Sequence, residues 1–306
     1  MEFSKLDGGR KGYMQNKNKL KKMREILTNP GVGVGVGAGD ALCAKLIEHA
    51  GFDFIWSSSL CVSASFAVPD ANLISMSQYC EVARSMNEVV SIPVIADCDT
   101  GYGNANNVIY AVKKFEEAGI VGISIEDKKF PKDNSLLEGG RQELAPIEEF
   151  EGKIKAAKDH QQNEGFVVIA RVEALIAGWG QAEAMKRSLR YAEAGADCIL
   201  IHSKSKEPGE ILEFIGNWKA PVPLVLVPTN YPSLTLSAVE ALKKVKLFIY
   251  ANQPVRASIK AQEALLEEIK RAGGIHTVDP MMVPVSRIFD LQGVPAMKED
   301  EKKYLV

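Results

Sequence analysis

Residues 125–136 have the sequence Ile-Glu-Asp-Lys-Lys-Phe-Pro-Lys-Asp-Asn-Ser-Leu, and they follow an apolar alternation at Val121, Ile123 and Ile125. Alternation of β-branched residues predicts a buried strand. Carboxylates at the end of such a strand can hold hard cations, lysines neutralise anionic oxygens, and an Asn-Ser pair offers neutral donors. The segment therefore predicts one wall of a metal and oxyanion site. A charged surface loop is the alternative interpretation if the segment is taken alone.

The same alternation of strand and helix extends along the whole chain. Eight apolar strands, each followed by a helix, predict an α/β fold in which a parallel sheet closes as a (β/α)₈ TIM barrel. We expect Asp40 to cap the first helix of this series, and Leu42, Leu46 and Ile47 to face a core. An open doubly wound sheet is the alternative, but such even repetition is less typical of it. Strands are expected at 32–36, 52–56, 93–97, 121–126, 166–171, 198–202, 222–227 and 246–250, and later helices at 79–89, 107–117, 147–159, 181–194, 209–218, 236–243 and 255–271.

Composition limits the class of protein. The chain has 306 residues, of which 46% are hydrophobic and 25% charged, enough for one large core. We expect a basic N-terminal arm at 1–24 and a single barrel domain at 25–306 that includes the C-terminal helices. The net charge of −2 does not favour nucleic acid or a membrane surface as a partner. Only the basic arm would suggest nucleic acid, and a solvated helix explains it more simply.

Cysteine usage and hydropathy bear on the location of the protein. Five scattered cysteines lie within apolar patterns and form no CxxC pair, which is typical of reduced residues in a cytoplasmic protein. No run approaches the roughly 20 apolar residues of a membrane-spanning helix. The glycine-rich residues 31–39 lack a following Lys-Ser or Lys-Thr, so we interpret them as a tight first barrel strand rather than a phosphate-binding loop.

Polar side chains follow six consecutive strands of the predicted barrel. In a TIM barrel the carboxyl ends of the strands form the active-site face, so these residues should converge there. They predict a catalytic site at one end of the barrel. The strand ends are Trp56-Ser57-Ser58-Ser59 with Asp70 in the next loop, Asp97-Cys98-Asp99-Thr100-Gly101-Tyr102-Gly103, Glu126-Asp127-Lys128, Arg171-Val172-Glu173, His202-Ser203-Lys204 and Pro228-Thr229.

The residue types at these strand ends indicate the chemistry. Asp97, Asp99 and Glu126 are oxygen-only metal ligands, which suit Mg²⁺ or Mn²⁺ rather than zinc. Arg171 and His202 can bind a carboxylate or a phosphoryl group, the arginine through its two-pronged guanidinium. We therefore expect a small dianionic or trianionic substrate.

These motifs resemble the phosphoenolpyruvate mutase and phosphonopyruvate hydrolase branch of the isocitrate lyase superfamily. The resemblance runs from about residue 23 to about residue 291, and its most specific part is Glu-Asp-Lys at 126–128 followed, after five residues, by Asn134-Ser135. Isocitrate and methylisocitrate lyases carry a catalytic cysteine after this region. No cysteine lies between Cys98 and Cys198 here, so lyase chemistry is disfavoured.

The resemblance implies roles for individual residues. Asp97 would bind Mg²⁺ directly, while Asp99, Glu126 and Asp70 would hold its waters. Lys132, Asn134 and Ser135 would lie on a loop that closes over the site. The pyruvyl and phosphoryl groups would be surrounded by Trp56, Ser58, Arg171 and His202. The resemblance also implies a homotetramer, formed as a dimer of dimers, in which the last helix is exchanged between subunits.

Two activities fit the resemblance. A mutase moves the phosphoryl group between the enol oxygen of phosphoenolpyruvate and C3 of phosphonopyruvate, whereas the hydrolase cleaves the same carbon–phosphorus bond with water. Asn134-Ser135 favours the mutase, because the hydrolase has threonine at the position of Asn134. Residues 140–144, 167–178 and 222–235 resemble the hydrolase at least as well. We give more weight to the loop, since it would touch the reacting group, and expect a phosphoenolpyruvate mutase. The Trp-Ser-Ser-Ser run at 56–59 departs from the Trp-Gly-Ser-Gly that is common in both enzymes.

Overall fold

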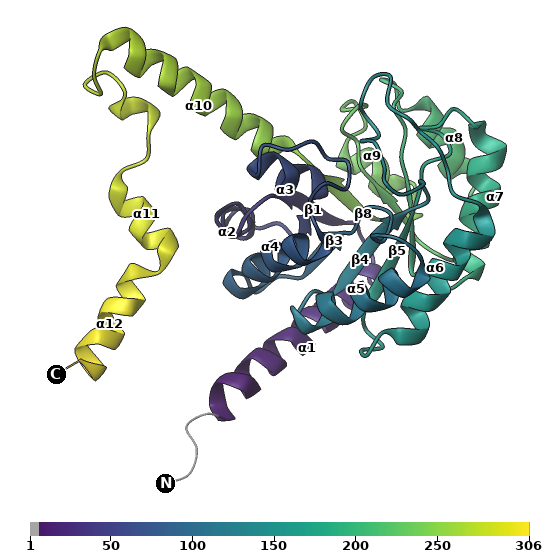
Figure 1. The fold of residues 1–306 in the computed structure, drawn as a ribbon, viewed down its shortest axis with the longest axis horizontal. Helices are drawn as coiled ribbons and strands as arrows, with labels where there is room; N and C mark the ends of the chain where they lie inside the picture. Colours follow the sequence, from purple (N-terminus) through teal and green to yellow (C-terminus); the bar gives the residue numbers. More distant parts are fainter. Residues whose placement is uncertain (1–5, 306) are drawn as a thin grey trace. The chain divides into compact units, whose positions relative to one another are not determined.

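A computed structural model describes the backbone of residues 6–305 and the side chains of residues 16–305. Eight parallel strands form a closed barrel in which each strand pairs with its neighbours along the chain and the last strand pairs with the first (Figure 1). This confirms the predicted (β/α)₈ barrel. The strands are β1 (Gly33–Ala38), β2 (Phe54–Ser57), β3 (Val94–Asp97), β4 (Gly122–Glu126), β5 (Val167–Val172), β6 (Cys198–Ile201), β7 (Leu224–Leu226) and β8 (Val245–Tyr250).

Helices connect the strands and cover the outside of the barrel (Figure 1). The first is α1 (Leu6–Thr28), so the boundary predicted between residues 24 and 25 falls within a helix, and residues 1–5 of the predicted arm lie outside the described residues. The domain boundaries stay a prediction. The other barrel helices are α2 (Ala41–His49), α3 (Ser59–Ser65), α4 (Met76–Val89), α5 (Ala105–Glu117), α6 (Ile147–His160), α7 (Gly180–Glu193), α8 (Gly209–Asn217) and α9 (Leu236–Ala241).

The chain divides into two compact units, residues 1–253 and residues 254–306. The first contains the whole barrel. Helix α10 (Gln253–Ala272) begins at the boundary, and α11 (Val285–Gln292) and α12 (Val294–Tyr304) complete the second unit. In the described part of the chain, no helix has both the length and the apolar character needed to cross a membrane.

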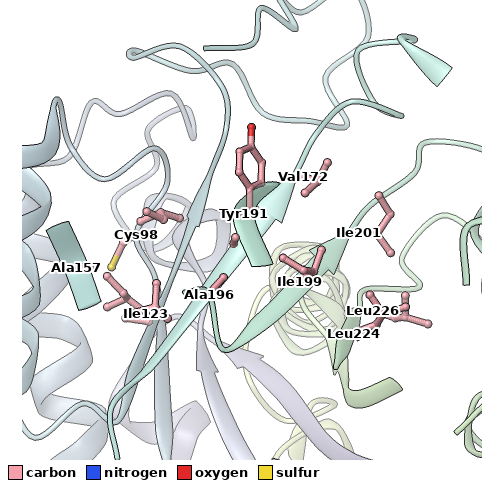
Figure 2. Close-up of a cluster of buried hydrophobic side chains, with 14 of the residues drawn as sticks. Cys98, Ile123, Ala157, Val172, Tyr191, Ala196, Ile199, Ile201, Leu224 and Leu226 are labelled. Atoms are coloured by element: carbon pink, nitrogen blue, oxygen red, sulfur yellow. The ribbon is translucent and has the colours of Figure 1, made fainter. Parts of the chain in front are cut away.

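Alternate residues of each strand serve two separate apolar layers. In β5, Val167 and Ile169 pack inside the barrel, whereas Val168 and Ala170 pack against the surrounding helices. This period of two follows from the pleat of a strand, which sends successive side chains to opposite faces. Figure 2 shows part of the outer layer, where side chains of the paired strands β6 and β7 lie side by side. They are Ile199, Ile201, Leu224 and Leu226.

The glycines of β1 make room for neighbouring groups. A Cβ atom on Gly35 would lie 2.3 Å from the Phe54 ring, and one on Gly37 would lie 1.8 Å from the Ala251 carbonyl oxygen. Real side-chain atoms do not approach so closely, so only glycine fits at either position. The glycine-rich segment thus belongs to a tightly packed strand, as its pattern predicted.

Helix α1 covers the end of the barrel where the strands begin. Its Met23 and Leu27 join the apolar layer inside the barrel. Arg24 donates to the Phe166 carbonyl at 2.5 Å and pairs with Asp197 at 2.8 Å, and these residues directly precede β5 and β6. Buried apolar packing and a few ion pairs therefore close this end.

Helix α2 corrects one prediction about the core. Ile47 is buried, but Leu42 and Leu46 are 53% and 45% exposed. Asp40 caps the helix by accepting from the Cys43 amide, as predicted, and the buried residues of the helix are Ala44 and Ile47. All five cysteines are free; Cys43 is half-buried and the others are buried.

Candidate active site

A pocket opens at the carboxyl ends of the strands, as the strand-end residues predicted. It is lined by predicted site residues from β2, β3 and β5, by His202 directly after β6, and by residues that follow β7 and β8. Four residues from the loop 128–144 also line it, so this loop lies over the pocket. The predicted residues that line it are Trp56, Ser58, Asp70, Asp97, Lys132, Asn134, Ser135, Arg171 and His202.

An acidic wall lies at the ends of β3 and β4. Asp97 is the last residue of β3 and accepts a hydrogen bond from the Ser59 hydroxyl at 2.9 Å. Asp99 accepts from the Asn72 amide at 2.8 Å and has a φ of 52°, a left-handed conformation that is uncommon outside glycine. Such backbone conformations concentrate at functional sites. Burial raises the pKa of Asp97, and it raises the pKa of Asp99 to about 7.

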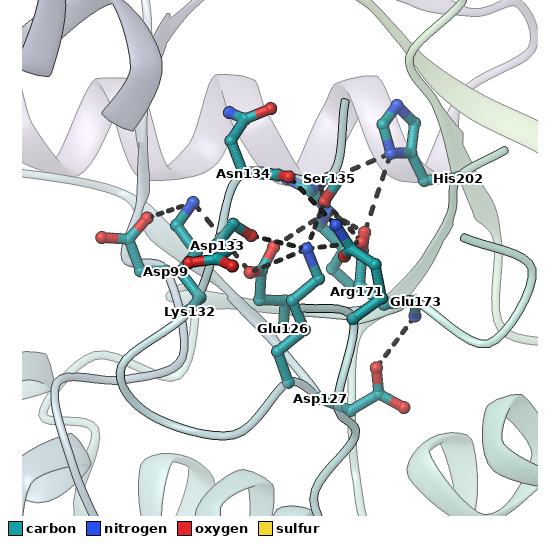
Figure 3. Close-up of polar contacts among 12 residues, drawn as sticks. Asp99, Glu126, Asp127, Lys132, Asp133, Asn134, Ser135, Arg171, Glu173 and His202 are labelled. Carbon is teal, nitrogen blue, oxygen red and sulfur yellow. Dashed lines mark hydrogen bonds and ion pairs between the residues drawn. The ribbon is translucent and has the colours of Figure 1, made fainter. Parts of the chain in front are cut away.

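The ammonium of Lys132 lies among these acids (Figure 3). Its Nζ is 2.7 Å from Asp99, 3.2 Å from Asp70 and 4.0 Å from Glu126. Burial alone would lower the pKa of Lys132, but the surrounding carboxylates raise it well above its ordinary value. For Asp70, Lys132 and the Asn134 amide outweigh burial and lower the pKa. Lys132 therefore stays charged and neutralises part of the wall.

The acidic wall has the donor set that a hard divalent cation requires. In the described chain, Oδ1 of Asp70 and both carboxylate oxygens of Glu126 are buried without a hydrogen-bond partner. No three His, Cys, Asp or Glu side chains of the described residues already form a group that could hold a metal ion. The cluster nevertheless contains five buried carboxylates and three cationic side chains, which leaves a net charge near −2 if all are ionised. They are Asp70, Asp97, Asp99, Glu126 and Glu173 against Lys128, Lys132 and Arg171.

The loop 128–144 is fixed at its base and over the pocket. Lys128 and Leu144 form an antiparallel bridge at the base. Above it, the Asn134 amide donates to Asp70 at 2.6 Å, and the Lys132 backbone amide donates to Asn72 at 2.8 Å. Asn134 has two N–H groups, so one remains for a group bound in the pocket.

Ser135 and Arg171 meet beneath the loop (Figure 3). Arg171 donates to the Ser135 hydroxyl at 2.8 Å and to Glu173 at 2.6 Å, and its Nε is 3.3 Å from Glu126. The arginine is thus held from two sides while it lines the pocket. A guanidinium fixed in this way is prepared to bind an anionic substrate oxygen without reorganisation.

His202 presents an uncommitted nitrogen. Its Nδ1 lies 3.4 Å from Arg171 and 3.7 Å from Glu173, while its Nε2 is buried and has no hydrogen-bond partner in the described chain. Burial and Arg171 lower the pKa of His202, so the neutral imidazole is favoured. Trp56 and Ser58 also line the pocket. The Ser58 hydroxyl accepts from the Cys61 amide and thereby caps the N-terminus of α3.

Several functional positions carried no assigned role in the sequence analysis. Ser59 and Asn72 orient Asp97 and Asp99, and Asn72 stands two residues after Asp70, so its loop position was a usable signal. Glu173 was part of a strand-end motif and lies in the middle of the polar network. Others that line the pocket are Leu60, Leu136, Val227, Thr229, Ala251 and Asn252.

Comparison with known proteins decides the family. A family model described as phosphoenolpyruvate phosphomutase matches residues 23–270. The chain belongs to the phosphoenolpyruvate phosphomutase family. This family lies within the isocitrate lyase superfamily.

Relatives of this phosphomutase-family chain include both activities. It is 51% identical to a phosphonopyruvate hydrolase of Variovorax sp. (strain Pal2), over 94% of this chain and 99% of that protein. A crystal structure of a phosphoenolpyruvate phosphomutase from Streptomyces platensis subsp. rosaceus has 46% identity and a TM-score of 0.92, covering 94% of this chain and 99% of that one. The structure of a phosphonopyruvate hydrolase complex with oxalate and Mg²⁺ has 49% identity and a TM-score of 0.90, covering 94% and 100%. The chain is thus similar to enzymes that act on phosphonopyruvate or phosphoenolpyruvate, and overall similarity does not separate the two.

Proposed function

We propose that this chain is a phosphoenolpyruvate mutase that interconverts phosphoenolpyruvate and 3-phosphonopyruvate. The observation that carries the proposal is the position of Asn134. It lies on the loop 128–144, lines the pocket and donates to Asp70 of the acidic wall. An amide at this place can bind a transferring phosphoryl oxygen and occupies space that an attacking water would need.

The proposed reaction is an intramolecular transfer. The C3–phosphorus bond of phosphonopyruvate breaks, its electron pair forms the enolate of pyruvate, and the enolate oxygen forms the new bond to phosphorus. Atoms and charge balance without water or a proton. The transferring phosphoryl group is loosely bonded to both partners, so excluding water is the main task of the loop.

A divalent cation fits the acidic wall, and we propose Mg²⁺, with Mn²⁺ as a substitute. Asp97 would bind it, and Asp99, Glu126 and Asp70 would hold it through water. When bound, Mg²⁺ would act as a Lewis acid for the carbonyl and carboxylate oxygens of the substrate. The structure of a related hydrolase with oxalate and Mg²⁺ supports this choice. The cation would also neutralise the negative charge that remains on the cluster.

The residues of the chain divide the remaining work. Arg171, held by Glu173, would bind the anionic oxygens of the substrate. His202, neutral and with a free Nε2, would contact the phosphoryl group. Lys132 would balance charge near the acidic wall, and Trp56 and Ser58 would pack against the pyruvyl group. Together these groups position the enolate and the phosphoryl group for recombination.

Phosphonopyruvate hydrolase is the second candidate, because the chain is 51% identical to one over nearly its whole length. Phosphorus NMR of the protein with phosphonopyruvate and Mg²⁺ separates the two activities. The mutase produces phosphoenolpyruvate as the first product, and the hydrolase produces inorganic phosphate together with pyruvate.

We also infer a cytoplasmic homotetramer, built as a dimer of dimers. The amphipathic helix α10 leaves Ile259 and Leu266 48% and 64% exposed, and this apolar stripe, with Leu265 and Ile269, suits exchange with a second subunit. Light scattering after gel filtration tests the assembly. A monodisperse monomer would contradict it.

A further inference from the structure

Glu173 is a completely buried carboxylate at the centre of the network under the loop 128–144. It lies one residue beyond β5, and beyond its hold on Arg171 no role has been assigned to it. Its Oε2 accepts from the Ser135 hydroxyl at 2.5 Å and lies 3.3 Å from the Lys128 ammonium. Its Oε1 accepts from Arg171 at 2.6 Å. One carboxylate therefore contacts the loop, the base of the loop and the arginine that lines the pocket.

The hydrogen bonds of Ser135 show what this contact does. The Ser135 hydroxyl accepts from Lys128 and from Arg171, each at 2.8 Å, and donates to Glu173. A hydroxyl has one donor and two acceptor positions, so all of them are used. Ser135 therefore has nothing left to offer a substrate while the loop is in this position. Its place in the network is that of a fastening point for the loop.

The environment of Glu173 keeps it charged and in place. Arg171 and Lys128 outweigh the effect of burial and hold the pKa of Glu173 well below its ordinary value. The Glu173 backbone amide donates to Asp127 at 2.8 Å. Asp127 in turn accepts from Arg187 and Tyr191 of α7, at 2.9 and 2.8 Å. A rigid helix outside the barrel thus supports the network from behind.

We propose that Glu173 is a positioning residue that holds the loop 128–144 over the pocket through Ser135 and at the same time orients Arg171. This role of Glu173 extends the proposed mutase function. Only its predicted effect on the fate of the phosphoryl group rests on that function. Because Ser135 bonds both Glu173 and Arg171, a loop that covers the pocket adds a further contact to the arginine that Glu173 holds. The consequence is that the site is prepared for phosphoryl transfer when water is excluded.

Glutamine at position 173 tests this arrangement at nearly constant size. A glutamine has one acceptor oxygen and one donor nitrogen. In either orientation of the amide, its NH₂ group faces another donor, either the Ser135 hydroxyl or the Arg171 guanidinium. Glu173→Gln therefore breaks one of the two contacts without leaving a cavity. The matched control is Glu151→Gln, a buried glutamate that pairs with Arg190 at 2.5 Å between α6 and α7, outside the pocket.

The first experiment measures hydrogen exchange of the backbone amides in residues 128–144, with and without Mg²⁺ and oxalate. In Glu173→Gln we expect exchange in this segment to rise at least about tenfold relative to wild type, with the rest of the barrel unchanged. Glu151→Gln should leave the segment at wild-type exchange. Unchanged exchange in Glu173→Gln, in a variant with a normal thermal transition, would overturn the proposal. This readout does not depend on which product the enzyme makes.

The second experiment uses phosphonopyruvate and Mg²⁺ and compares Glu173→Gln, Ser135→Ala and the double variant. We expect kcat to fall roughly 10- to 100-fold, the usual scale for a supporting partner, with a smaller change in KM. The fraction of phosphoryl groups released as phosphate should rise in both single variants and rise no further in the double variant. Additive effects would overturn the proposed action through Ser135. If wild type releases only phosphate, the mutase assignment fails, and the exchange measurement still decides the role of Glu173.

Discussion

The two ends of the barrel differ in their side chains, which are mainly apolar where the strands begin and mainly charged where they end. Where the strands begin, Met23 and Leu27 of α1 complete an apolar interior with residues such as Phe54 and Leu247. Where the strands end, buried carboxylates and cations fill the mouth, and several carboxylate oxygens lack hydrogen-bond partners in the described chain. Burying apolar surface stabilises a fold, whereas burying a charge costs free energy unless the charge is paired and hydrogen-bonded.

The residues that stabilise the fold and those proposed to carry the chemistry therefore lie at opposite ends of the barrel. A change at the closed end should act on folding and leave the chemistry intact. A change at the mouth should do the reverse. This separation is typical of TIM barrels, in which the strand ends carry the catalytic residues.

The largest effect should follow from Asp97→Ala at the mouth. We expect turnover to fall by at least about a thousandfold, because the acidic wall loses the carboxylate that we propose as the direct metal ligand. The thermal transition should stay within a few degrees of wild type, since burial already raises the pKa of this carboxylate and its charged form does not favour folding. Steady-state kinetics at saturating Mg²⁺ and calorimetry measure the two effects. Asp159→Ala, on the exposed surface of α6, is the control, and near-normal activity of Asp97→Ala would remove Asp97 from the site.

The opposite result is expected from Leu247→Ala at the closed end. Leu247 is completely buried in the interior layer, and truncation of such a leucine costs about 2–5 kcal/mol of folding free energy. The kcat of the folded fraction should be unchanged. Denaturant unfolding measures the loss, and Leu212→Ala, at a site that is 38% exposed on α8, serves as a control with a much smaller cost. A large drop in kcat at full folding would contradict the separation of the two ends.

A somewhat smaller effect should follow from changing Asn134. Asn134→Ala should lower isomerisation by at least about a hundredfold, the scale for loss of one transition-state donor. Asn134→Thr should release more inorganic phosphate, because the shorter side chain leaves space for water and its hydroxyl can orient it. Phosphorus NMR of the products measures both. If wild type already releases mainly phosphate and Asn134→Ala leaves that rate unchanged, the hydrolase is the correct assignment.

The smallest effect concerns a buried cation at the closed end. Lys19 is 1% exposed and donates to the backbone and side-chain oxygens of Asn87, both at 2.7 Å. Burial lowers the pKa of Lys19 to about 8, with Glu48 opposing part of the shift. An unfolded chain titrates lysine near 10.4, so between about pH 8 and about pH 10.4 the unfolded state binds more protons. The free energy of unfolding should therefore rise as the pH increases through this range.

The measurement compares wild type with Lys19→Met in denaturant unfolding at about pH 7.5 and about pH 9.5. The difference in unfolding free energy should shift by about 1 kcal/mol in favour of wild type at the higher pH. Lys22→Met, at an exposed position of the same helix, should show no such shift. An equal pH dependence of the two variants would contradict the assignment to Lys19.

The fold was predictable because its signals are local and repeated. Eight apolar strands alternate with helices, and in the structure each strand lies within two residues of its predicted position at either end. The buried face of a helix was harder to predict: the Asp40 cap of α2 is present as predicted, but Leu42 and Leu46 are exposed. Apolar spacing within one helix does not report which of its apolar residues the sheet will cover.

The site was predictable only as a set of strand ends. The strand-end rule places Asp97, Glu126, Arg171 and His202 at one mouth, and three of these four line the pocket. It cannot show that Lys132 returns 2.7 Å from Asp99, or that Ser135 meets Glu173, because these contacts depend on the path of a loop. The two residues of each contact are 33 and 38 positions apart in the chain, so no local sequence pattern indicates that they meet.

The covered mouth should transfer the phosphoryl group without admitting water. The most direct test is turnover of phosphonopyruvate with Mg²⁺ in isotopically labelled water, followed by mass analysis of the first products. A mutase should give phosphoenolpyruvate whose phosphoryl oxygens carry no label, with little labelled phosphate. Labelled inorganic phosphate and pyruvate as the main products would contradict it.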